Sequence, residues 1–399
     1  MAGNTDLGAA KKNKNDEFYT QYGDIEAEMN AYYEYNRDVF RGKTVLLPCD
    51  DPEWSNFTKY FAANFERFGL KKIISTSYVK SAGSRELTLF EQESPLFDEE
   101  KHGTRGKLFT LTKKSGNTKY VDTDDIEFTG YLEGDGDFRS AEVTKLRDEA
   151  DIIITNPPFS LFREFVAWIL SGKKQFVIIG NQNAITYKEI FPLLKENKIW
   201  LGNGFKGNAG FFYAPQYEDY AAAGQHKEGF IRVSGVMWFT NMDLGKRHEE
   251  LLLDTMAHNL KFNKKLKKKL ANDFQTTKYP RYDNYDAMEV PFTECIPSDY
   301  DGVMGVPITF LDKYNPEQFE IVGFAGGWNG KSDLVTRKYP KIQKQHDKHG
   351  KTQNVGKMND GTASFKVVQK PCNMTYYTVD DEFFYIRSYG RILIRAKKV

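Results

Sequence analysis

The sequence has few cysteines, no long apolar run and almost no net charge. Its three cysteines, Cys49, Cys295 and Cys372, lie far apart, which argues against both a disulfide framework and a zinc site. No stretch approaches the roughly 18 consecutive apolar residues of a membrane-spanning helix. The N-terminal residues also lack the apolar segment of a secretory signal. These absences predict a soluble, cytoplasmic protein without a metal site.

The net charge of +1 conceals two halves of opposite sign. Residues 1–249 contain 32 Lys and Arg against 37 Asp and Glu, a balance of −5. Residues 250–399 contain 24 against 18, a balance of +6. The whole-chain value would argue against a nucleic-acid partner, but a basic C-terminal half makes such a partner plausible again.

The first half alternates between predicted strands and predicted helices. Five aromatic residues at helical spacing predict one helix over 57–70 that ends at Gly69: Phe57, Tyr60, Phe61, Phe65 and Phe68. Short apolar runs predict strands at 43–49, 71–78, 148–160 and 174–180. The alternation indicates an α/β fold with a mostly parallel sheet and crossover helices. A ligand site is then expected outside the carboxyl ends of the strands.

Two stretches depart from this alternation. Residues 79–128 are predicted to be an insertion between the second and third core strands, with a hairpin turning at Ser115-Gly116-Asn117. From about residue 250, short apolar segments lie among Pro, Gly and Asp, which predicts a β-rich second domain over 250–399. The basic run Lys264–Lys269 within it fits either phosphate contacts or, more simply, a solvated helix face.

The sequence Asn156-Pro157-Pro158-Phe159 follows the apolar strand DIIIT. Two prolines fix a turn and remove two backbone donors, so the Asn oxygen and nearby carbonyls become acceptors beside an aromatic ring. Such a corner suits a planar group with an exocyclic amine, whose two hydrogens are accepted while the ring stacks. The simpler alternative is a strand-ending turn with a buried Phe.

With this motif, the chain resembles the EcoRI-type family of adenine-specific DNA methyltransferases. The resemblance rests on long segments, at 15–29, 43–78, 131–165, 177–212 and 228–241, and it continues into 301–323. It implies a Rossmann-like class I methyltransferase core in residues 1–249 and a target-recognition domain in residues 250–399. It also implies S-adenosyl-L-methionine as the cofactor.

The resemblance assigns the cofactor to residues from four segments. They are the N-terminal motif Phe18, Tyr19 and Thr20, the loop Pro48, Cys49, Asp50 and Asp51, the strand end Ser75 and Thr76, and the pair Asp137 and Phe138. The loop 48–57 contains no glycine, although related enzymes usually have a glycine-rich loop there. Asp50 or Asp51 supplies a carboxylate under this interpretation; a surface aspartate or a helix cap is the alternative.

The same resemblance assigns the target base to Asn156, Pro157, Pro158 and Phe159, with Phe230 as a second stacking face. The implied activity is site-specific N6-methylation of a flipped adenine in double-stranded DNA, in restriction-modification or as an orphan modification enzyme. Three alternatives stay open: an RNA adenine or protein-glutamine methyltransferase with the same tetrapeptide, a bifunctional restriction subunit, and a non-catalytic DNA-binding module. A separate cognate endonuclease, the oligomeric state, and a chromosomal, plasmid or phage origin are equally open.

Overall fold

A computed structural model describes residues 19–50, 55–79, 96–113, 125–205, 209–213, 230–372, 374–379 and 383–397; for residues 19, 213, 230 and 231 it describes the backbone only. The chain folds into two compact units. The first consists of residues up to Ala184 together with Ile199–Gly245, and the second consists of Ile185–Lys198 together with Lys246 onward. None of the helices in the described ranges is long and apolar enough to cross a membrane.

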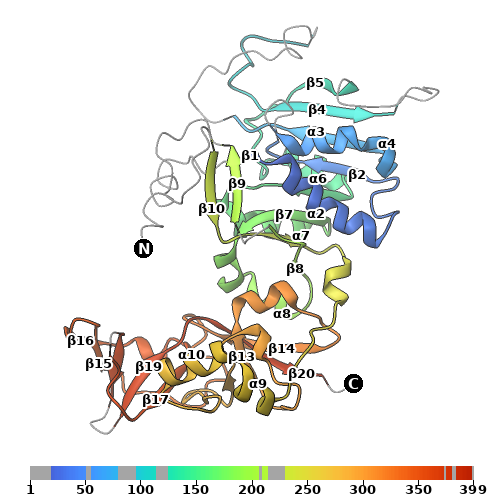
Figure 1. Ribbon diagram of the computed structural model, residues 1–399. Helices are drawn as coiled ribbons and strands as arrows, with labels where there is room; N and C mark the ends of the chain where they lie inside the picture. Colours follow the sequence, from blue (N-terminus) through green and yellow to red (C-terminus); the bar gives the residue numbers. More distant parts are fainter. Residues whose placement is uncertain are drawn as a thin grey trace. The chain divides into compact units, whose positions relative to one another are not determined.

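The first unit is built on an eight-stranded sheet with the order β5-β4-β3-β2-β6-β7-β11-β8 (Figure 1). Its four central strands are parallel: β3 (Lys72–Thr76), β2 (Thr44–Leu47), β6 (Ile152–Thr155) and β7 (Gln175–Asn181). The outer strands are antiparallel: β4 (Lys107–Thr112), β5 (Glu127–Tyr131), β11 (Val236–Thr240) and β8 (Trp200–Leu201). The sheet is therefore mixed, with a parallel centre.

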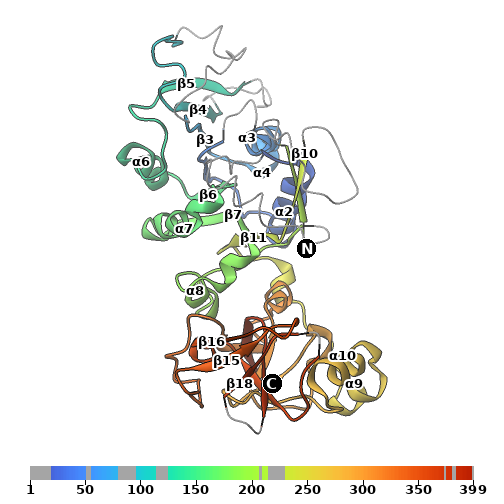
Figure 2. The same ribbon diagram turned by 90° about the vertical axis from the view of Figure 1, so that its left-hand side faces the viewer.

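Helices cover both faces of this sheet (Figure 2). On one face lie α2 (Tyr22–Tyr35), α3 (Asn56–Ala63) and α4 (Phe65–Phe68), and on the other α6 (Ala141–Glu149) and α7 (Phe162–Ser171). Because alternate strand residues point to opposite faces, Val45, Leu47 and Ile154 pack with the first set of helices. The α/β prediction for this half is confirmed, and the sheet that was expected to be mostly parallel is parallel in its four central strands.

The predicted helix over 57–70 is two helices. All five aromatic residues of the pattern are buried, as predicted. The chain leaves the helical path at Asn64, between α3 and α4, and α4 ends at Gly69 in the left-handed conformation (φ 63°). The spacing of apolar residues predicted the buried face correctly, because this spacing is a local property. It did not predict the break at Asn64, because the spacing continues unchanged across the break.

The predicted insertion contributes strand β4 to the sheet. β4 pairs antiparallel with β3 on one side and with β5 on the other. The expected turn at residues 115–117 lies outside the described residues. This stretch therefore extends the sheet beyond β3, the last of the parallel strands on that side.

A separate three-stranded sheet has the order β1-β9-β10. It consists of β1 (Tyr19–Thr20), β9 (Ala209–Tyr213) and β10 (Phe230–Ser234). In its register Tyr19 and Phe230 both pair with Tyr213, one on each side. Two predicted site segments that are about 210 residues apart in the chain thus belong to one small sheet.

The second unit is β-rich, as predicted, and contains two sheets. One has the order β12 (Met288–Glu289), β13 (Met304–Pro307), β20 (Arg391–Ala396) and β14 (Phe319–Ala325). The other has the order β16 (Thr352–Val355), β15 (Gln343–His346), β18 (Tyr376–Thr378), β19 (Phe384–Arg387) and β17 (Ser364–Val367). Its helices are α8 (Phe191–Lys195), α9 (Met256–Phe262) and α10 (Lys264–Phe274). The predicted division after residue 249 stays a prediction about domains.

Candidate active site

The strand order places two predicted motifs next to each other. From β2 the chain passes to β3 on one side, whereas β6 lies on the other side of β2 and leads to β7. The order of the parallel strands therefore reverses between β2 and β6. Ligands of open α/β sheets bind at such a point, beyond the carboxyl ends of the strands. The loop beginning at Pro48 follows β2, and Asn156 follows β6.

Hydrogen bonds tie three strand ends together at this point. The Thr155 hydroxyl, at the end of β6, donates to the Pro48 carbonyl oxygen at 2.7 Å. The Asp50 amide donates to the Thr76 carbonyl oxygen at 2.7 Å, and the Ser75 hydroxyl donates to the Asp50 carbonyl oxygen. The candidate cofactor loop is thus fixed to β6 on one side and to β3 on the other. Sequence reasoning missed Thr155 because its partner lies 107 residues away.

In the loop after β2, Cys49 adopts a backbone conformation that is usually found at glycine. Its φ is 66°, in the left-handed region that non-glycine residues rarely adopt. The hydrogen bonds of Pro48 and Asp50 on either side hold the backbone there. The loop therefore makes the tight turn without glycine, at the cost of some backbone strain.

Substitutions of Cys49 should distinguish this backbone strain from a requirement for the thiol. Cys49→Gly is expected to leave the free energy of unfolding within about 1 kcal/mol of the parent value. Cys49→Val, which is β-branched, is expected to lower that free energy by about 1–3 kcal/mol. The same substitutions at the exposed Cys372, whose φ is not positive, serve as controls in urea denaturation. Equal stability of the two Cys49 variants would contradict the strain argument.

Asp50 is a buried carboxylate. Its side chain accepts a hydrogen bond from the Ser55 hydroxyl at 2.6 Å, and the residue is only 5% exposed. Ser55, in turn, accepts from the Phe57 amide and caps α3. Asp50 is therefore not a surface residue, and the cap of α3 is Ser55. Asp51 lies outside the described residues.

Two buried threonine hydroxyls beside this loop lack a hydrogen-bond partner among the described residues. They are Oγ1 of Thr20 in β1 and Oγ1 of Thr76 at the end of β3. The Asn56 side chain at the start of α3 donates to the Thr20 carbonyl oxygen at 2.7 Å, which brings β1 to this edge of the sheet. Buried polar atoms are normally satisfied, so these two hydroxyls at one edge are candidates for hydrogen bonds to a polar ligand. Of the other two predicted members of this motif, Phe18 lies outside the described residues, and only the backbone of Tyr19 is described.

Asp137 is held by a neighbouring arginine that sequence reasoning did not name. The Arg139 guanidinium donates to both Asp137 carboxylate oxygens, and this side-chain hydrogen bond is the main cause that lowers the pKa of Asp137. Asp137 is therefore ionised at neutral pH. Phe138 is 2% exposed and makes edge contacts with Phe165 and Trp168, at ring-centroid distances of 4.9 and 5.5 Å. Its proposed contact with the cofactor stays a prediction.

Close backbone packing brings the Asp137 loop to the end of β3. Gly136 has a φ of 88°, and a Cβ atom on it would lie 2.1 Å from the Ser77 carbonyl oxygen. Only glycine fits such an approach. A glycine is thus required at position 136, next to Asp137 and against Ser77, whereas the loop after β2 contains none.

The Asn-Pro-Pro-Phe turn leaves β6 at the same edge. Pro157 is buried, whereas Asn156, Pro158 and Phe159 are partly exposed. The Pro158 carbonyl accepts from the Leu161 amide at 2.9 Å and begins the 3₁₀ turn Phe159–Leu161. Phe159 packs against the edge of the core but is not fully buried. The alternative interpretation, a turn with a buried Phe, therefore does not describe this residue. In the described part of the chain no cluster of three or more His, Cys, Asp or Glu could hold a metal ion.

Comparison with known proteins defines the class to which this fold and site belong. Residues 6–397 match the family described as "Adenine-specific methyltransferase EcoRI". Type II methyltransferase M.EcoRI of Escherichia coli is 43% identical over 338 residues, which cover 84% of this chain and 93% of that protein. Type II methyltransferase M.MpnI of Mycoplasma pneumoniae is 33% identical over 352 residues, 87% of this chain and 92% of that protein.

A third relative, Type II methyltransferase M.MgeORF184P of Mycoplasma genitalium, is 35% identical over 318 residues, 78% of this chain and 84% of that protein. No solved structure matches the chain. The molecule is thus an adenine-specific methyltransferase. The chain belongs to the EcoRI family of these enzymes.

Proposed function

We propose that the chain is a site-specific DNA methyltransferase that transfers a methyl group from S-adenosylmethionine to N6 of a flipped adenine in duplex DNA. The observation that carries the proposal is the position of Asn156-Pro157-Pro158-Phe159 at the reversal point of the parallel strands, beside the Pro48–Asp50 loop. The names of the relatives, all Type II methyltransferases, support DNA as the substrate and restriction-modification as the setting.

The residues at the strand ends fit S-adenosylmethionine. The cofactor is cationic and carries several polar groups. This edge offers the carboxylates of Asp50 and Asp137 together with the hydroxyls of Thr20 and Thr76, which have no hydrogen-bond partner in the described part of the chain. Under this proposal the parallel centre of the sheet is a Rossmann-like class I core. When bound, the cofactor supplies a methyl group activated by its sulfonium. The Thr76 hydroxyl would form a hydrogen bond with the cofactor at the end of β3, where related enzymes usually have an acidic residue.

Asn156 and Pro157 would hold the target amine. The Asn156 side-chain oxygen and the Pro157 carbonyl accept its two hydrogens, which returns the nitrogen lone pair from the ring and makes it nucleophilic. Phe159 stacks on the base, and Phe230 is proposed as the opposite face. Transfer would form the N–C bond as the bond between sulfur and the methyl carbon of S-adenosylmethionine breaks and the thioether leaves, and the amine would lose one proton to solvent. Flipping the base costs roughly a few kcal/mol, which DNA contacts made elsewhere must offset.

We assign those DNA contacts to residues 250–399, because this basic half carries a charge balance of +6. In this role the second unit binds phosphates and reads base edges, and the first unit performs the chemistry. A cytoplasmic location follows from access to bacterial DNA. A cognate endonuclease would be a separate protein, recognising the same DNA sequence.

The test is methyl transfer from labelled S-adenosylmethionine to unmethylated genomic duplex DNA, followed by sequencing for modified bases. We expect N6-methyladenine within one short sequence. Label in RNA or in a glutamine-containing release factor, and none in duplex DNA, would support the rival methyltransferase activities instead. Cofactor binding without transfer to any substrate would favour a non-catalytic DNA-binding module.

A further inference from the structure

The second unit carries a hairpin, residues 338–357, whose strands β15 and β16 form one edge of a five-stranded sheet, where β15 also pairs with β18. We call this hairpin the ribbon. The strands pair antiparallel from Gln343 opposite Val355 to His346 opposite Thr352. β16 is the edge strand of its five-stranded sheet, with β15 as its single neighbour (Figure 1). Exposed edge strands invite pairing with other chains, and lysines are a common protection. This ribbon contains more lysines than are needed to prevent such pairing.

The ribbon is strongly basic. Its 20 residues contain six lysines, all exposed, and one acidic residue, Asp347: the lysines are Lys338, Lys341, Lys344, Lys348, Lys351 and Lys357. Within the described part of the chain none of the six ammonium groups forms an ion pair. In α10, two of the five lysines are paired: Lys265 with Glu294 at 3.0 Å, and Lys269 with Asp273. The ribbon is therefore a better candidate for phosphate contacts than the lysine run of α10.

The single acidic residue stabilises the turn of the ribbon. The Asp347 carboxylate accepts from the backbone amides of Lys351 at 2.9 Å and His349 at 2.8 Å. The hydrogen bond from Lys351 is the largest cause that lowers the pKa of Asp347. Gly350 completes the turn with a φ of 86°. The turn is thus defined by its own hydrogen bonds, and Lys348 and Lys351 remain exposed on it.

The ribbon also presents amide side chains on one face. Gln345 lies directly opposite Gln353, and directly opposed residues share a face of a sheet. Thr352, Gln353 and Asn354 are all exposed, and no hydrogen bond to the side chain of Gln353 is found among the described residues. Glutamine amides are among the side chains that read purine edges, since each offers both a donor and an acceptor.

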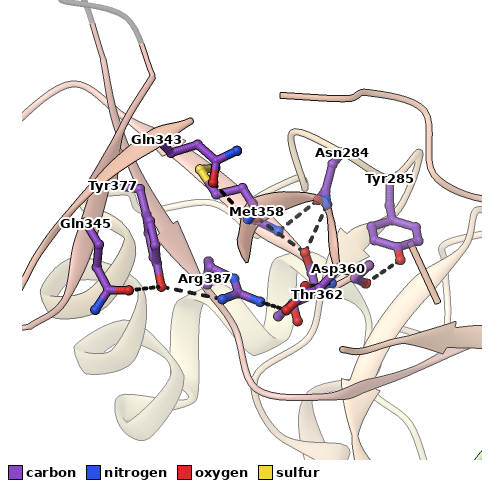
Figure 3. Close-up of polar contacts among 11 residues, drawn as sticks. Asn284, Tyr285, Gln343, Gln345, Met358, Asp360, Thr362, Tyr377 and Arg387 are labelled. Atoms are coloured by element: carbon purple, nitrogen blue, oxygen red, sulfur yellow. Dashed lines mark hydrogen bonds and ion pairs between the residues drawn. The ribbon is translucent and has the colours of Figure 1, made fainter. Parts of the chain in front are cut away.

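A chain of hydrogen bonds orients Gln345 (Figure 3). Arg387, which is bound to Asp360, donates through Nη1 to the Tyr377 hydroxyl at 3.4 Å. Because a guanidinium only donates, Tyr377 must accept this bond and give its own proton to Gln345 Oε1, at 3.3 Å. The oxygen of the Gln345 amide therefore faces Tyr377, and its NH₂ group is turned away. Such support of a reading side chain is what specific recognition requires.

We infer that this ribbon lies in the major groove of duplex DNA, with Gln345 and Gln353 at base edges and the lysines on the flanking phosphates. The inference rests on the proposed function and names the element that selects the DNA sequence. The major groove, about 12 Å wide, admits a two-stranded ribbon. The NH₂ group of Gln345 matches purine N7 or O6, and Gln353 can bind adenine through both N6 and N7.

The test compares three full-length variants with the parent enzyme on duplex oligonucleotides that carry the modified sequence found in genomic DNA. For Gln353→Ala and Gln345→Ala we expect the preference for that sequence over single-base changes to fall about 5- to 150-fold at the contacted pair. For the double variant Lys344→Gln/Lys348→Gln we expect weaker binding to every duplex. The slope of log K against log salt should then fall by about 0.9 for each phosphate that the variant no longer neutralises.

The double variant Lys265→Gln/Lys269→Gln is the matched control, because it removes the same two charges from lysines that already have acidic partners. It should leave sequence preference and salt slope unchanged. Thermal unfolding checks each variant, and Gln353→Ala decides the case if Gln345→Ala fails to fold. A parent enzyme that methylates DNA while all ribbon variants keep its preference and slope would overturn this inference alone. A parent enzyme that transfers no methyl group to duplex DNA would overturn the proposed function and, with it, this inference.

Discussion

Replacing Asn156 with alanine is expected to lower the rate of methyl transfer by about 100- to 1,000-fold, the usual effect of removing one group that stabilises a transition state. Asn156 follows β6, whereas the groups that we assign to the cofactor come from β1, the Pro48–Asp50 loop after β2, the end of β3 and the Asp137 loop. Cofactor affinity should therefore change only a few-fold. Single-turnover transfer and equilibrium cofactor binding measure the two effects separately.

Asn156→Asp is the informative companion variant. A carboxylate keeps an oxygen acceptor at the same distance from the backbone, so this variant should retain far more activity than the alanine variant. Thermal unfolding should show all three proteins folded. If Asn156→Ala lost cofactor binding as completely as it lost transfer, the division of roles between β6 and the other strand ends would be wrong.

Replacing Glu289 with glutamine is expected to lower the free energy of unfolding by about 3–5 kcal/mol, because it leaves the charge of Arg391 without its buried partner. Glu289 is 0% exposed, and the Arg391 side chain is 11% exposed. Arg391 Nη2 lies 2.7 Å from Glu289 Oε1, and the Tyr282 hydroxyl also donates to this carboxylate. β13 lies between the strands of the two residues, so the pair spans three strands of the sheet.

The same sheet offers a matched control. Arg395 lies four residues along β20 from Arg391 and pairs with Glu320 of β14 at 2.8 Å, but both side chains are about half exposed, at 47% and 46%. Glu320→Gln is expected to lower the free energy of unfolding by at most about 1 kcal/mol. Urea denaturation of both variants in one buffer measures the contrast. Similar effects at the two positions would mean that burial does not determine the strength of these pairs.

The sequence allowed prediction of features that depend on local pattern. The apolar period over 57–70 identified five buried aromatic residues, and the apolar runs before Pro48 and Asn156 identified β2 and β6. It also allowed the prediction that ligand-binding groups gather beyond the strand ends. The inferences about buried residues and strands succeeded because side-chain periodicity and strand-ending turns are properties of a few consecutive residues. The binding of a ligand beyond the strand ends stays a prediction.

Features that depend on distant pairing could not be predicted in this way. The contact between Thr155 and Pro48 and the pairing of β1 with β9 both require knowledge of which segments become neighbours. The left-handed conformation of Cys49 was equally hidden, because cysteine carries no signal for it. The composition of residues 250–399 predicted a β-rich unit, but no local pattern in the sequence predicts the order of its strands.

Residues 185–198 belong to the second unit although the residues on both sides of them in the chain belong to the first. This affects how the enzyme can be cut into fragments or combined with a relative. Phe191 in α8 is 3% exposed and packs against Phe324 and Trp328, with ring centroids 5.1 and 6.3 Å away. A fragment that ends at residue 249 would expose this aromatic side chain and is expected to aggregate. A chimera that takes its specificity from a relative must therefore import the α8 segment along with the C-terminal half. Transfer of only one part would separate Phe191 from its own partners, Phe324 and Trp328.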